Sequence, residues 1–310
     1  MGVFVFLPLV LPLSAWPIAR LAERHLHPRA ATWLLTVVAA VLAVCSTLCL
    51  ALVMVVGTAQ LPGNPLPDSW SSPRVQDAVP YDEVAGKASI PALGAVLAAC
   101  ARTAWRHHRL RSRAARALLG LPAGPVAVLP DELPYAYALP GKPGRVVATT
   151  GMLRTLTSPE RRVLFAHERA HLTHRHHRFL LTVQIAARAN PFLRPLRTAV
   201  GYTTERWADE EAAARVGDRR LVARAVGRAA LVSRGYMPAV GIPDFASPGP
   251  VPRRVAALLE PTPAPRNWPP VFTAVGLAAW AAAAGATASA LSSANAAVSL
   301  FLILKAATPL

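Results

Sequence analysis

The run His167-Glu168-Arg169-Ala170-His171 determines the interpretation of this chain of 310 residues. It places two imidazoles four positions apart, with a carboxylate beside the first. On a helix, residues i and i+4 lie on one face, so both rings can bind one metal ion. An H-E-x-x-H arrangement is typical of a zinc site whose glutamate accepts a proton from water. We therefore expect His167 and His171 to be metal ligands and Glu168 to be the catalytic base.

The residues before this motif predict the start of a helix. Thr157-Ser158-Pro159-Glu160 can begin a helix in two ways. Ser158 is the N-cap with Pro159 at the first helical position, or Thr157 is the N-cap and Glu160 completes a capping box. Apolar residues continue through the following turns at Val163, Leu164, Phe165, Leu172, Phe179 and Leu180.

A third protein ligand is needed, because a catalytic zinc takes three and leaves one position open. We expect it to be Glu205, in an acidic run that precedes the helix-ending Gly217. Asp209 follows Glu205 by four residues and is expected to accept a hydrogen bond from a ligand histidine. His174 is a rival third ligand. The alternative interpretation of the acidic run is a solvated helix face that binds no metal. For the H-E-x-x-H motif itself, the alternative is a polar helix face.

The remaining histidines are expected to have other roles. His176 and His177 are predicted to be exposed or at the membrane surface, and His107 and His108 to belong to a basic cluster. No histidine follows His177, so a transition-state stabiliser from later in the chain must be another donor. The sequence leaves three other donors open, namely Tyr202, Arg206 and Arg215.

Composition predicts a membrane protein. Hydrophobic residues make up 53% of the chain and charged residues only 16%, against about 25% in ordinary soluble domains. We expect spans at about 2–19, 32–56 and 86–104 in a membrane domain over 1–104. A C-terminal unit over 269–310 is expected to hold one helix at about 270–291, with Ser292 near its break.

The distribution of charge predicts the orientation. The loop 20–29 is basic, the loop 61–87 is acidic, and six arginines follow between 102 and 116. Basic loops favour the cytoplasmic side, so 61–87 is expected to be external and the N-terminus outside the cell membrane. The insert 105–268 is then cytoplasmic. It contains most of the formal charge of +17, which we attribute to this bias and to anionic lipid headgroups. No nucleic-acid recognition motif accompanies the charge.

Three short runs in the insert predict a small sheet. They lie at 126–129, 135–138 and 145–149, and proline and glycine separate them. The expected fold is a mainly α membrane protein with about four transmembrane helices. A cytoplasmic α+β metalloprotease domain is inserted between the third and the fourth. One of the strands is a candidate for binding a substrate backbone as an added strand.

Together, the H-E-x-x-H motif and the later Glu205-x-x-x-Asp209 between membrane segments resemble the BlaR/MecR-type membrane metallopeptidases. The chain is more distantly similar to the HtpX and CAAX-prenyl-protease type. The resemblance covers about 120–260 and implies a zincin-like cytoplasmic domain with one Zn²⁺ per chain. It further implies His167, His171 and Glu205 as ligands, Glu168 as base and Asp209 as their partner. The implied activity is cleavage of a protein, often a transcriptional repressor in a signalling pathway.

One feature of the antibiotic-sensing relatives is not found. The chain has no S-x-x-K motif followed by a sensor-sized segment, so we expect no β-lactam sensing of that kind. A trigger would be the loop 61–87, the membrane or a partner.

Three other functions remain open from the sequence, the last of them weaker than the other two. A quality-control protease would cut many membrane proteins, whereas a signalling protease would cut one site. A non-catalytic scaffold would hold a structural zinc, although such a site needs no base like Glu168. A DNA-binding membrane protein is a weaker alternative.

Overall fold

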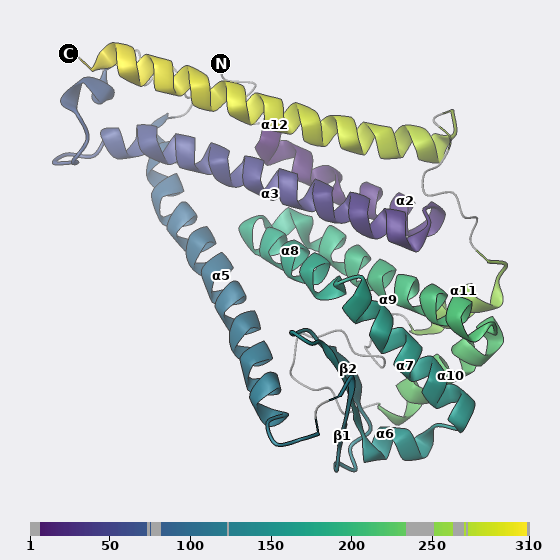
Figure 1. Cartoon of the computed structure of the whole chain (residues 1–310). Coiled ribbons are helices and arrows are strands. Elements are labelled where there is room, and N and C mark those ends of the chain that lie inside the picture. Colours follow the sequence, from purple (N-terminus) through teal and green to yellow (C-terminus); the bar gives the residue numbers. More distant parts are fainter. Residues whose placement is uncertain are drawn as a thin grey trace.

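The computed structural model describes residues 7–72, 82–122, 124–233, 251–262 and 272–308, together with 75 and 270. Most of the described chain is helical (Figure 1). Long helices form one part of the molecule, and shorter helices with a small sheet form the other.

Three described helices are long and apolar enough to cross a membrane. They are α3 (Pro28–Ala59), α5 (Asp82–Ala117) and α12 (Ala274–Ala307). Helices α3 and α12 pack side by side and run in the same direction (Figure 1). The loop after α3 meets the C-terminal end of α12, where Trp70 Nε1 donates to Thr308 Oγ1 at 3.0 Å.

The span expected at 2–19 is not among the candidate spans in the described residues. Its described part is helical at 7–10, forms a 3₁₀ turn, η1 (Leu11–Ser14), and continues as the short helix α2 (Ala15–His25). Pro12 lacks the N–H that a continuous helix would use, so the helix is interrupted there. Residues 1–6 of this expected span lie outside the described residues.

The break expected near Ser292 was wrong, because α12 is continuous from Ala274 to Ala307. Ser292 and Ser293 are buried, and Ser293 Oγ lies 3.7 Å from Cys49 Sγ of α3. Small polar residues let membrane helices approach closely, so they support the helix here instead of ending it.

The shorter elements follow α5. The strands are β1 (Val126–Leu129), β2 (Ala136–Leu139) and β3 (Arg145–Thr149), within one residue of their predicted positions. They form one sheet in the order β1-β3-β2, with β1 parallel and β2 antiparallel to β3. The helices are α6 (Thr150–Thr155), α7 (Ser158–Thr173), α8 (His176–Ala189), α9 (Arg194–Val216), α10 (Arg219–Val232) and α11 (Val251–Leu259).

The helix that carries the motif, α7, packs against β2 and β3 on one side and against α9 on the other. Helices α8 and α9 pack in turn on α3. Thr32 Oγ1 of α3 donates to Thr203 Oγ1 of α9 at 2.9 Å in this buried interface. Its apolar core includes Leu35, Val38, Leu42, Phe179, Val183, Leu196 and Trp207.

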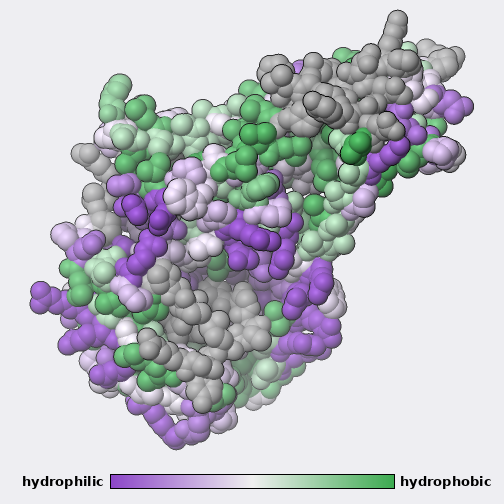
Figure 2. Space-filling view, turned by 180° about the vertical axis from the view of Figure 1, so that it is seen from behind, coloured by the Kyte–Doolittle hydropathy of each residue, from purple (hydrophilic) through white to green (hydrophobic). Residues whose placement is uncertain are grey.

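The surface reflects this division. Figure 2 shows hydrophobic residues gathered over the part formed by the long helices, and hydrophilic residues over the shorter helices and the sheet. Beneath this surface, one apolar core between α3, α8 and α9 connects the long helices to the part that carries the motif.

Candidate metal centre

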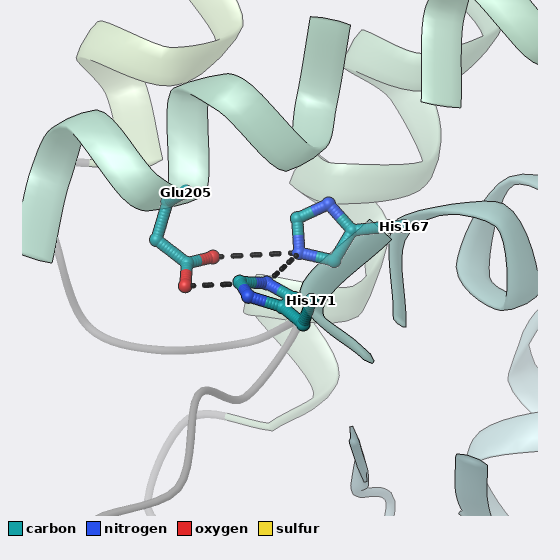
Figure 3. A group of neighbouring side chains, drawn as sticks. All are labelled: His167, His171 and Glu205. Atoms are coloured by element: carbon teal, nitrogen blue, oxygen red, sulfur yellow. Dashed lines mark hydrogen bonds and ion pairs between the residues drawn. The ribbon is translucent and has the colours of Figure 1, made fainter. Parts of the chain in front are cut away.

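His167, His171 and Glu205 lie together, with their ligand atoms within 4.8 Å of one another (Figure 3). His167 Nε2 is 3.0 Å from His171 Nε2 and 3.4 Å from Glu205 Oε2. His171 Nε2 is 3.5 Å from Glu205 Oε1. Tetrahedral ligand atoms at about 2.0–2.2 Å from a zinc ion lie about 3.3–3.5 Å apart. The spacing and the donor types therefore fit one zinc ion.

The first turn of α7 is held by a capping box that defines where the helix carrying the motif begins. Thr157 is the N-cap, and Glu160 Oε2 accepts a hydrogen bond from the Thr157 backbone N–H at 2.8 Å in a capping box. Of the two starts that the sequence allowed, the structure has this one. Arg228 Nη1 of α10 also donates to Glu160 Oε2 at 2.9 Å. Burial raises the pKa of Glu160, but the hydrogen bonds from Thr157 and the charge of Arg228 outweigh it and lower the pKa.

The acidic residues come from α9. The helix follows a 3₁₀ turn in which Asn190 Oδ1 accepts from the Phe192 N–H at 3.0 Å. It ends at Gly217, as predicted, in the left-handed region with a φ of 77°. Glu205 and Asp209, one turn apart, both face α7 and are buried.

Asp209 lies behind the first histidine. His167 Nδ1 is 3.1 Å from Asp209 Oδ1, and both side chains are fully buried. Burial lowers the pKa of His167, but Asp209 and Glu205 outweigh it and raise the pKa to about 9. The surroundings of His167 thus attract positive charge, which a proton or a metal cation can supply. The structure brings Asp209 to the position expected for the partner of a ligand histidine.

Arg254 is the residue of this site that the sequence analysis missed. Its guanidinium is fully buried, with Nε 2.8 Å from Asp209 Oδ2 and Nη2 2.7 Å from Asp209 Oδ1. Nη1 lies 3.1 Å from Glu205 Oε2. On α11 it shares the buried face with Ala257 and Leu258, at i+3 and i+4. An arginine on the apolar face of an amphipathic helix was therefore the available signal.

Three carboxylates are buried at the site close to one buried guanidinium. Glu168, Glu205 and Asp209 are buried near Arg254, whose guanidinium is the one buried arginine group among the described residues. When the three carboxylates are ionised, this group has a net charge of about −2, and buried charge is costly unless it is compensated. A divalent cation between His167, His171 and Glu205 would neutralise the group.

The histidines that follow the motif lie in different surroundings. His174 Nε2 lies 3.2 Å from Glu211 Oε1, outside the three-residue cluster. The expectation that His176 is exposed was wrong, because its side chain is completely buried. It begins α8 and turns back so that Nδ1 lies 2.9 Å from His171 Nδ1. His177 is half-buried.

The three donors left open by the sequence have other neighbours. Arg206 Nη2 donates to Glu210 Oε1 at 3.1 Å. The ring of Tyr202 lies 4.3 Å below the guanidinium of Arg253. Arg215 is among the lining residues of a pocket between α7 and α9. These positions give no reason to choose any of the three as a transition-state stabiliser.

Comparison with known proteins found similarity to one family model over part of the chain. The model of Peptidase family M48 matches residues 101–189, from within α5 to the end of α8. This range includes the H-E-x-x-H motif and supports a metallopeptidase. It ends before Glu205, Asp209 and Arg254, whose part in the site rests on the geometry above. No curated protein and no solved structure matched the chain.

Proposed function

We propose that the protein is a membrane-bound, zinc-dependent endopeptidase that cleaves a protein substrate on the cytoplasmic side. The observation that carries the proposal is the convergence of His167, His171 and Glu205, with Glu168 buried next to them on α7. It occurs where α7, within the range similar to M48 peptidases, meets α9. A His₂Glu donor set favours zinc over other divalent ions.

The residues divide the chemistry between them. Bound zinc would lower the pKa of a bound water to about 7 and would polarise the scissile carbonyl. Glu168 would take the proton from the attacking water and pass it to the leaving amine. Asp209 would hold His167 with its proton on Nδ1, so that Nε2 is free to bind metal. Arg254 would hold Asp209 and offset the charge of Glu205.

The orientation is proposed from charge and from helix direction. Arg20, Arg24 and Arg29 precede or begin α3, so by the bias of basic loops we propose that its start is on the cytoplasmic side. The acidic loop 61–87 is then external, and the arginines after the apolar part of α5 are cytoplasmic. Helix α12 runs parallel to α3, and its end meets the external loop at Trp70. The three candidate spans of the described residues, α3, α5 and α12, fit this orientation.

The substrate is proposed only as a class. The resemblance to BlaR/MecR-type proteins implies one repressor cut at one place, whereas a quality-control enzyme of HtpX type would cut many unfolded membrane proteins. Mapping the cleaved bonds in membranes with wild-type protein and with an inactive variant separates the two by the number of sites. A single substrate supports the signalling role.

The Glu168→Gln variant tests the catalytic assignment. Glutamine keeps the shape of the side chain but cannot accept the proton, so zinc content should stay at the wild-type level and peptide cleavage should be lost. Glu132→Gln is the matched control, because that side chain is 75% exposed and pairs with Arg154 on the surface. Full cleavage by Glu168→Gln would contradict the mechanism. Zinc binding without cleavage of any substrate by wild-type protein would favour the scaffold with a structural zinc.

A further inference from the structure

Three buried imidazoles form a row at the junction of α7 and α8. His167 Nε2 is 3.0 Å from His171 Nε2, and His171 Nδ1 is 2.9 Å from His176 Nδ1. The first two rings belong to the proposed metal site, but no role considered so far includes the third. We propose that His176 is a positioning residue that accepts a hydrogen bond from His171 Nδ1 and so fixes the ring and tautomer of this ligand. The proposal rests on the proposed zinc site.

The chemistry of imidazole determines the direction of this hydrogen bond. His171 turns Nε2 toward His167 and Glu205, so Nε2 is the atom that would bind the metal. A neutral imidazole that binds through Nε2 has its proton on Nδ1 and donates it to a neighbour. At 2.9 Å that neighbour is His176 Nδ1, which must therefore be the acceptor. His176 would then be neutral with its own proton on Nε2.

The two proposed histidine ligands would thus have different supports. Asp209 lies 3.1 Å from Nδ1 of His167. His176 occupies the corresponding position at Nδ1 of His171. An uncharged acceptor on the second ligand adds no further negative charge to a group that already holds three carboxylates. A carboxylate in place of His176 would be the fourth in this group and would exceed the charge that one divalent cation and Arg254 neutralise.

The fold places His176 tightly. Arg175, just before it, has a φ of 54°, an uncommon backbone conformation for a residue other than glycine. This sharp turn between α7 and α8 brings residue 176 back to residue 171. The His176 ring then packs 4.7 Å from the Trp207 ring of α9 and 6.5 Å from Phe179. Phe179 meets Trp33 of α3 edge-on at 4.7 Å, so the position of His176 is set from both sides.

Two amide substitutions separate hydrogen bonding from packing. Asparagine has its oxygen on the same carbon as the Nδ1 of histidine, so His176→Asn keeps an acceptor near His171. In His176→Gln the oxygen is one bond further out, near the former Nε2, so the acceptor is misplaced. His176→Leu keeps bulk without any acceptor. His174→Leu is the control outside the cluster, because His174 pairs with Glu211.

The experiment measures the zinc dissociation constant of the full-length protein in detergent, by competition with a chelator. We expect His176→Leu and His176→Gln to bind zinc about 10–100-fold more weakly, as losses of such supporting partners do. His176→Asn and His174→Leu should stay within about threefold of wild type, well short of that loss. In zinc-loaded protein labelled with ¹⁵N-histidine, wild type and His176→Asn should show a slowly exchanging Nδ1 proton, which His176→Leu lacks.

The outcomes are distinct. If wild type binds zinc and the Gln and Leu variants bind it equally well, the proposal for His176 is overturned while the zinc site stands. Equal weakening in all three variants, Asn included, would mean packing instead of hydrogen bonding and would also overturn it. If wild type binds no zinc, the proposed function fails first. Should His176→Leu not fold, the comparison of Asn with Gln still decides.

Discussion

Arg254 and Asp209 form a buried pair with two hydrogen bonds, at 2.8 Å and 2.7 Å, between a short helix and α9. The same guanidinium lies 3.1 Å from Glu205 Oε2. One cation thus contacts both carboxylates that α9 presents to the histidines. Because α11 precedes the candidate span α12 in the chain, this contact connects that part of the chain to the candidate metal centre.

Replacing Arg254 by leucine should strongly destabilise the folded protein. It would leave two buried carboxylates without their cation, a loss that costs roughly 3–5 kcal/mol when one partner of a buried pair is removed. We expect a large drop in the thermal unfolding temperature of the detergent-purified protein without zinc, and partial recovery in the double variant with Asp209→Asn. Arg253→Leu is the control, because Arg253 is 46% exposed and should cost at most about 1 kcal/mol. Equal effects of the two single variants would contradict this role.

The capping box of α7 predicts a pH dependence. The pKa of Glu160 is lowered in the folded protein by its Thr157 and Arg228 contacts, against the effect of burial. A carboxylate with a lowered folded pKa stabilises the fold above its unfolded pKa, and this contribution is lost as pH falls through the folded value. Glu160→Gln should therefore be less stable than wild type at pH 7, by about 1 kcal/mol. In unfolding measurements the gap should close as the pH falls below the unfolded pKa of 4.5. A gap independent of pH would show that charge is not involved.

The crossing of α3 and α5 predicts a sharp difference between two glycines of one helix. A Cβ at Gly86 would lie 2.6 Å from Gly57 Cα, whereas a Cβ at Gly94 meets nothing within 4 Å. Gly86→Ala should lower the unfolding temperature and the yield of folded protein, because the helices cannot keep this approach. Gly94→Ala should be neutral or slightly stabilising. Equal stability of both variants would contradict the close crossing.

Much of the site was predictable because local rules govern it. Helical spacing places His167 with His171, and Glu205 with Asp209, and the caps at Thr157 and Gly217 fix both helices. The short strands were predictable from alternating composition between turn residues.

Other features depend on tertiary contacts that no local pattern encodes. Nothing in the sequence distinguishes Arg254 from the neighbouring Arg253 except the face of a short helix. His176 was expected at the surface because it lies in a polar, basic run, yet the turn at Arg175 returns it to the site. Hydropathy predicts one regular helix for the first segment, whereas its described part contains a 3₁₀ turn at Leu11–Ser14, where Pro12 lacks an N–H. In α12, burial against α3 makes Ser293 a packing residue.

The central claim is that His167, His171 and Glu205 bind one zinc ion, and zinc content per chain tests it most directly. The measurement compares detergent-purified wild type with His171→Ala and Glu205→Ala. The account predicts one zinc per chain in wild type and loss or sharp weakening of binding in both variants. No bound metal in wild type, or binding that is indifferent to Glu205, would contradict it.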